Sequence, residues 1–187
     1  MKAWLLALLF VLAGCGVGVT ETTGVSISAP PPPGGFNDTD VMFLQMAVPQ
    51  HEQGIEMARL AEKRADRKEV RDLATAIRLT QADEVEAMKK WLVAWEQPIA
   101  PDLDPNAHTA HGGMHGTDPA VLQMLRDTPA GPEFDNRFLN LLTGHQHGAV
   151  ELARMEEKDG LNSDTRALAT RIVQSRTAQI QQIGTYL

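Results

Sequence analysis

The chain has 187 residues, a formal net charge of −7 and few aromatic side chains, at 5% of the sequence. This length is enough for one domain with a substantial core, and the lack of a basic run argues against a nucleic-acid partner. Alanine, leucine, glutamate and arginine dominate the body of the chain, which favours an all-helical fold.

The N-terminus carries the pattern of an export signal. Lys2 precedes an apolar stretch, residues 3–13, that is too short to span a bilayer as a permanent helix. The only cysteine, Cys15, closes the sequence LAGC and resembles the lipidated cysteine of bacterial lipoproteins. We therefore expect a lipoprotein signal peptide over residues 1–14 and a protein that is exported and anchored to the bacterial cell envelope by lipidated Cys15. The alternative is an ordinary signal peptide with an incidental cysteine.

Residues 15–36 contain the lipidated cysteine and a tether rich in glycine, serine, threonine and proline. They show neither helical nor strand periodicity, which predicts a disordered segment with a stiff polyproline stretch. The folded part of the protein is expected to span residues 37–187.

This folded part consists of an internal sequence repeat of two units. At a constant offset of 95, residues 43–92 align with residues 138–187 without a gap and share 13 identities. A gapless match of this length predicts a duplicated pair of helices. We expect repeat 1 at about 38–96, a linker with a short helix at 97–131, and repeat 2 at about 132–187.

Apolar residues at helical spacing predict two long helices in repeat 1. The first should be capped by Asn37 or Asp38 and end near Arg64. Asp66 and Glu69 resemble a capping box and predict the start of the second helix.

Repeat 2 is expected to carry helices at about 133–159 and from about Ser163 to the C-terminus. Gly160 suits the turn between these helices. Asp118 and Pro119 can start the short helix that precedes them. Four long helices in two hairpins predict an all-α four-helix bundle.

The candidate functional residues of the sequence are soft metal ligands, methionine and histidine. Neither a GxSxG stretch nor a phosphate-binding glycine loop is present, and no histidine has the glutamate of an ExxH motif. We therefore expect no enzyme. Methionine and histidine together select copper, especially Cu(I), and the linker holds four such residues: His108, His111, Met114 and His115. A polar linker with incidental histidines is the alternative.

His145 and His147 are separated by one residue, which raises the question of a shared ion. Two residues along an α-helix correspond to a rotation of about 200°. If the segment is helical, the two rings point to nearly opposite sides and cannot bind one metal ion together.

The repeat alignment points instead to a site between the two halves of the bundle. It pairs Gln50 with His145 and places Met46 one turn before Gln50, on the same helix face. His51 falls on the apolar stripe and should point inward. We expect a bundle metal site that involves Met46, His51 or His145, the alternative being hydrogen-bonded core histidines and methionines that only fill space.

The stretches DVMFLQMAVPQHEQGIEMARLAEK and FDNRFLNLLTGHQHGAVELARMEEK resemble the two halves of a bacterial envelope family, domain of unknown function 305. The resemblance covers about residues 37–187 and implies a ferritin-like four-helix bundle made of two hairpins. Some members bind copper through methionine and histidine and are linked to copper tolerance. The resemblance therefore implies a copper ion as the cofactor.

The family motif in each half reads roughly FLxMMIxHHxxAVxMA, followed by QxxEIxxMxxWL. This chain keeps one histidine of each pair, and its methionines survive mainly in the first half, whereas Leu141, Leu152 and Ile183 replace them in the second. The resemblance implies a bundle site with a reduced set of ligands: Met46, His51, Met57, Met88 and His145.

Two functions remain open at this point. The first is a membrane-tethered extracytoplasmic metal-binding protein, for copper before other ions, that serves buffering or tolerance; its partners are a metal ion and, through the lipid anchor, the membrane. The second is a structural or partner-binding envelope lipoprotein with an eroded metal site. An oxidase acting on bound metal has no support beyond the fold class.

Overall fold

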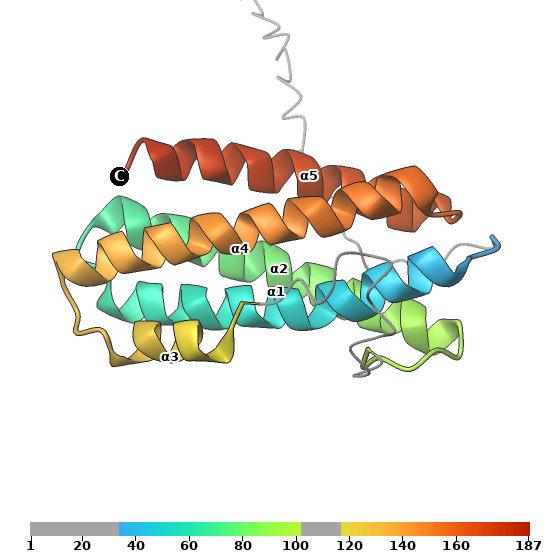
Figure 1. Cartoon of the computed structure of the whole chain (residues 1–187), viewed down its shortest axis with the longest axis horizontal. Helices are drawn as coiled ribbons and strands as arrows, with labels where there is room; N and C mark the ends of the chain where they lie inside the picture. The colour runs from blue at the N-terminus through green and yellow to red at the C-terminus, as the bar shows by residue number, and fades with distance from the viewer. Residues whose placement is uncertain (1–33, 102–116) are drawn as a thin grey trace, which may run out of the picture.

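The computed structural model describes residues 34–101 and 117–187, in which all regular elements are α-helices. These are α1 (Asp38–Arg64), α2 (Lys68–Ala94), α3 (Pro119–Asp127), α4 (Pro132–Asp159) and α5 (Ser163–Gly184). Figure 1 shows two hairpins, α1–α2 and α4–α5, side by side, with the short α3 along the outside of α1. The fold confirms the predicted all-α, ferritin-like bundle of two hairpins. None of the described helices has the length and apolar character needed to cross a bilayer.

Local sequence signals set several helix starts. At the beginning of α1, the Asp40 amide donates to the Asn37 side chain, and the Asp40 carboxylate accepts from the Asn37 amide. This reciprocal capping box satisfies two amides that have no partner within the helix. Asp118 and Asn162 likewise accept backbone hydrogen bonds at the starts of α3 and α5.

Asp40 and Asp135 occupy equivalent positions in the two repeats, and each binds the turn of the other hairpin. The Asp40 carboxylate accepts hydrogen bonds of 2.9 and 3.2 Å from the amides of residues 161–162, between α4 and α5. The Asp135 carboxylate accepts bonds of 2.8 and 3.0 Å from the amides of residues 66–67, between α1 and α2. These crossed bonds fix the position of one hairpin along the other.

The predicted capping box of Asp66 and Glu69 is wrong. The helix α2 begins at Lys68, and its N-cap residue Arg67 makes no side-chain capping bond. The Asp135 carboxylate binds the amides of Asp66 and Arg67 instead, so a residue of α4 replaces the local cap. A tertiary contact has here taken the place of a sequence-local one.

Two apolar clusters fill the bundle, one toward each end. The first cluster lies toward the α4–α5 turn and includes Leu44, Val48, Met88, Leu92, Leu152 and Ile172. The second cluster lies toward the α1–α2 turn and includes Met57, Ile77, Leu125, Phe134, Phe138 and Leu142. Because α3 contributes Leu125, it belongs to the second cluster and extends the core beyond the four long helices.

Glu156 is a fully buried carboxyl group near the α4–α5 turn. Burial, together with the neighbouring Asp40, raises the pKa of Glu156 to about 8. Although burial opposes the charged form of Asp40 as well, hydrogen bonds from the Thr165 hydroxyl and the Asn37 amide hold the pKa of Asp40 below its ordinary value. A protonated carboxyl therefore faces an ionised one at neutral pH.

The C-cap position of α4, residue 160, is suited to glycine because of this carboxyl group and not because of backbone freedom. Its φ of −67° and ψ of 148° are accessible to any residue. A Cβ at this position would lie 2.2 Å from Glu156 Oε1 and 2.7 Å from the Glu156 carbonyl oxygen. The glycine predicted for this turn is thus present, but it makes room for a buried side chain and does not form a left-handed cap.

Replacing Asp135 with alanine should lower the free energy of unfolding by about 2–4 kcal/mol, because two amides and Arg67 lose a charged acceptor. Urea denaturation followed by circular dichroism measures this loss. Asp72→Ala is the matched control, since Asp72 is exposed and pairs with Lys68 one turn away, a contact worth about 0.5 kcal/mol at most. Equal losses in the two variants would contradict the role of Asp135.

Replacing Glu156 with glutamine should remove a pH dependence of stability. The folded pKa of about 8 lies above the ordinary 4.5, so between these values the folded state keeps a proton that the unfolded state releases. The contribution of Glu156 to the free energy of unfolding is thus greatest below pH 4.5 and falls as the pH rises toward 8, by up to about 1.4 kcal/mol per pH unit. Thermal melts across this range should give a flatter profile for the variant; an unchanged slope would rule out a protonated Glu156.

Candidate functional site

A layer of polar side chains separates the two apolar clusters. On α2 the second cluster ends at Ile77 and the first begins at Val85, and on α4 the corresponding residues are Leu142 and Ala149. The side chains between them form what we call the polar layer: Gln50, His51, Gln81, Glu84, His145, Gln146, Arg176 and Gln179. All except the half-buried Gln179 are at most 5% exposed.

The two repeats supply the polar layer from equivalent positions. The offset of 95 pairs Gln50 with His145, His51 with Gln146, Gln81 with Arg176, and Glu84 with Gln179. In the first repeat His51 contacts Glu84 across α1 and α2, and in the second the Gln146 side chain donates to Gln179 across α4 and α5. One backbone arrangement therefore holds an ionisable pair in one half and a neutral amide pair in the other.

Arg176 joins the His51–Glu84 pair from α5. His51 Nε2 lies 3.0 Å from Glu84 Oε2; Arg176 Nη2 donates to the same oxygen and lies 3.4 Å from His51 Nε2. Burial opposes ionisation of Glu84, but the bond from His51 and the charge of Arg176 hold the pKa of Glu84 below its ordinary value. Burial also lowers the pKa of His51. The result is a carboxylate–guanidinium ion pair with a neutral imidazole beside it.

His145 is a neutral imidazole with one uncharged side-chain partner at each ring nitrogen. Thr117 Oγ1 lies 2.9 Å from Nδ1, and Gln50 Nε2 lies 3.1 Å from Nε2. Because an amide nitrogen only donates, Nε2 is the acceptor and Nδ1 carries the proton. Burial lowers the pKa of His145 to about 3, with further contributions from His51 and Arg176. The ring is therefore neutral at any physiological pH, with one N–H and one nitrogen free of a proton.

Gly54 makes room for His145 in the polar layer. A Cβ at this position would lie 2.2 Å from Gln81 Oε1 and 2.8 Å from His145 Nε2, so both atoms approach the same point. The equivalent residue of the second repeat is Ala149. Both amide atoms of Gln81 are buried without a hydrogen-bond partner among the described residues. Buried polar atoms of this kind are where a bound water or ion is expected.

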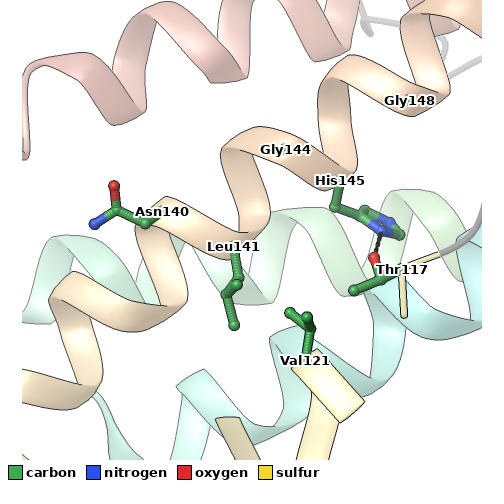
Figure 2. A pocket seen from close by; sticks show the side chains of 7 residues that line it. All are labelled: Thr117, Val121, Asn140, Leu141, Gly144, His145 and Gly148. Carbon is green, nitrogen blue, oxygen red and sulfur yellow. Dashed lines mark hydrogen bonds between the residues drawn. The ribbon is translucent and has the colours of Figure 1, made fainter. Parts of the chain in front are cut away.

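A surface pocket of about 320 Å³ adjoins His145. Its lining is Thr117, Val121, Asn140, Leu141, Gly144, His145 and Gly148, and Figure 2 shows the imidazole directed toward the Thr117 hydroxyl. Thr117 is the first described residue after 102–116, so the pocket lies where the predicted histidine- and methionine-rich loop rejoins the bundle. His147 is exposed, as its spacing from His145 predicted for a helix, and does not line the pocket.

The structure distributes the predicted bundle ligands over three places. His51 and His145 lie in the polar layer. Met46 and Met88 lie in the first apolar cluster, and Met57 lies in the second. None of the three methionines lines the pocket beside His145.

The remaining predicted ligands lie outside the described residues, namely His108, His111, Met114 and His115 of the loop, together with the lipidation site Cys15. Within residues 34–101 and 117–187, no three histidine, cysteine, aspartate or glutamate side chains form a metal-binding group. A metal ion at His145 would therefore need methionine, amide or loop ligands as well.

Glu84 and Arg176 are two residues of the site that the sequence patterns did not predict. Ile77, Gln81, Glu84 and Met88 follow the spacing of one buried helix face, so two polar residues in this stripe indicated a buried polar group. Arg176 occupies the position equivalent to Gln81 in the other repeat. The repeat alignment thus contained the signal, although it did not show that the arginine is fully buried.

Three solved structures show similar bundles. A DUF305 protein from Streptomyces coelicolor, described as secreted, is 29% identical, with a TM-score of 0.74 over 80% of this chain and 91% of its own. A DUF305 fragment from Deinococcus radiodurans is 24% identical, with a TM-score of 0.69 over 83% and 97%, and supports the fold alone. CopM in its Cu(II)-bound form is 26% identical, with a TM-score of 0.65 over 79% and 94%. CopM has also been solved in Cu(I)-bound and Ag-bound forms.

The family comparison agrees with these structures. No curated protein matches the sequence significantly. The model of the family described as Domain of unknown function (DUF305) matches residues 40–187, which include both repeats and the entire polar layer. The chain therefore belongs to the DUF305 family.

Proposed function

We propose that this protein is an extracytoplasmic metal-binding protein that takes copper through histidine and methionine ligands and serves buffering or tolerance. In this proposal a lipid on Cys15 holds it to the cell envelope, and the protein binds its ion without catalysing a reaction on it. The observation that carries the proposal is His145, a neutral buried imidazole at a surface pocket lined by Thr117, the residue at which a loop rich in soft ligands ends.

The chemistry of His145 fits a metal ligand. A metal ion requires an imidazole nitrogen without a proton, and the low pKa of His145 provides one without competition from protons. Its ring partners, the Thr117 hydroxyl and the Gln50 amide, are both uncharged. A metal ion can displace either of them without leaving a buried charge unpaired.

The loop that precedes Thr117 carries the proposed soft ligands. His115 precedes Thr117 by two residues in the sequence. Met114, His111 and His108 follow toward the N-terminus. Thioether and imidazole ligands together favour Cu(I) over hard cations, and this donor set is why we propose copper before zinc.

The relatives support the proposal in two respects. CopM, which shares the fold, binds Cu(I), Cu(II) and silver in its solved structures. The similar Streptomyces coelicolor protein is described as secreted, in line with an extracytoplasmic location for this chain. We extend both properties to this protein as part of the proposal.

A second candidate function is favoured by the other half of the polar layer. His51 contacts an ion pair, and its repeat equivalent Gln146 bonds another amide. This bonding is typical of a structural core. A partner-binding or structural lipoprotein whose bundle site has lost its metal is therefore the alternative that the same experiments must separate.

Copper titration of the full-length protein in detergent should show retention of Cu(I) against a competing chelator. His145→Ala should weaken Cu(I) affinity at least about tenfold, the equivalent of 1.4 kcal/mol, and joint replacement of His108, His111 and His115 by alanine should do the same. The matched control is His147→Ala, since this exposed ring lies two residues away on another face. Failure of the wild type to retain copper at micromolar concentration would favour the structural alternative.

The bundle methionines can be tested separately. Replacement of Met46, Met57 or Met88 by leucine removes the sulfur and nearly preserves the side-chain volume. A loss of Cu(I) affinity in one of these variants would assign that methionine to an inner site, and unchanged affinity in all three would place the site at His145 and the loop.

Cys15→Ser should release the protein from the membrane fraction of expressing cells, because acyl chains provide the proposed anchor. Intact-mass measurement of the wild type should show a chain that begins at Cys15 and carries added lipid. A variant that stays in the membrane fraction, or a wild type without lipid, would contradict the anchor while leaving metal binding untouched.

A further inference from the structure

We propose that Arg176 is a built-in cation, which takes the place of a metal ion beside His51 and Glu84 and so confines metal binding to the His145 side of the polar layer. This inference deepens the proposed function and rests on it. It concerns the specificity of the site and assigns to Arg176 a role in excluding metal ions.

His51 and Glu84 form the kind of pair that metal ions use. An imidazole from α1 and a carboxylate from α2 approach to 3.0 Å in a region where both side chains are at least 96% buried. Imidazole and carboxylate are ligands for zinc and other divalent ions. In this protein the third member of the group is a guanidinium, bonded to the same carboxylate oxygen that faces the ring.

The charge of Arg176 opposes a second cation at this place. Its side chain is fully buried, and a guanidinium does not lose its proton in proteins. Arg176 Nη2 lies 3.4 Å from His51 Nε2, so a metal ion bound to that nitrogen would meet the guanidinium at close range. Like charges repel strongly where water is excluded, and the ion would also have to break the bond between Arg176 and Glu84.

The position equivalent to Arg176 in the first repeat is occupied by an uncharged residue. Gln81 is the residue equivalent to Arg176, and it also lies fully buried in the polar layer. The layer holds one carboxylate, Glu84, and one guanidinium, Arg176, and its other six side chains are amides or imidazoles. Glutamine at position 176 would therefore leave the Glu84 carboxylate without a compensating cation, in a place that a metal ion could occupy.

The test compares Arg176→Gln with Arg171→Gln in the full-length protein. Both residues lie on α5 and both changes remove one positive charge, but Arg171 is exposed. Native mass spectrometry and titration with Zn(II) should show one additional bound ion in Arg176→Gln and none in Arg171→Gln. The double variant Arg176→Gln/Glu84→Gln should lose this additional ion. A folded Arg176→Gln protein that binds no more Zn(II) than the wild type would overturn the inference.

The inference can still be tested if the Arg176→Gln variant is less stable than the wild type. If the variant melts early, Zn(II) should raise its melting temperature, because a ligand that binds only the folded state stabilises it. Absence of this rescue overturns the inference as well. Arg176→Lys, which keeps the charge, should gain no Zn(II) and thereby separates the effect of charge from that of side-chain shape.

NMR of the imidazole nitrogens in the wild-type protein provides a second test of the inference about Arg176. Saturating Zn(II) or Cu(I) should shift the ring nitrogens of His145 and leave those of His51 unchanged, whereas a metal-induced shift of His51 Nε2 in the wild type overturns the inference. If the wild type binds no metal at all, the proposed function fails. The gain or lack of an ion in Arg176→Gln then still decides the role of Arg176 independently.

Discussion

The burial of one carboxylate constrains how the two hairpins of this bundle pack. Glu84 lies at mid-height between two apolar clusters, where an ionised group is tolerated only with compensating partners. The partners are His51 from the same hairpin and Arg176 from the opposite one. The two hairpins must therefore pack in the one register that brings Arg176 to Glu84, and a sliding displacement would leave both charges unpaired.

The same register is enforced at both ends of the molecule. Asp40 and Asp135 each accept backbone hydrogen bonds from the turn of the other hairpin. Apolar contacts alone specify such a position weakly, because aliphatic side chains tolerate small shifts along a helix axis. Charged acceptors that each bind particular amides do not tolerate such shifts, so they specify the position strongly. In the bundle aligned in this way, Thr117 Oγ1 lies 2.9 Å from His145 Nδ1, and both residues line the pocket.

Most of the fold follows from sequence patterns that act locally. Asn37 caps α1, Arg64 and Asp159 end α1 and α4, and the duplicated helix pair appears as predicted. The exceptions arise from contacts between distant segments. The cap expected at Asp66 does not form because the Asp135 carboxylate of α4 binds the Asp66 amide. No pattern in the residues around position 66 predicts this contact.

The candidate site was predictable to a smaller extent. His51 and His145 were found through the repeat and their helix faces, and both are buried in the polar layer. Arg176 was not found, because an arginine in a helix is exposed in most proteins and only the packed structure shows its burial. Gly54 was not found either, since its role depends on Gln81 and His145, which come from two other helices.

The crossed aspartates also bear on the symmetry of this architecture. Each hairpin offers the other one carboxylate and one turn, which is the self-complementary pattern of an isologous interface between identical subunits. One aspartate at this position in each hairpin is therefore enough to bind the turn of the other, so the contacts that align the two halves are shared by both repeats. The central residues are where the halves differ, with an ion pair's carboxylate in one and its guanidinium in the other.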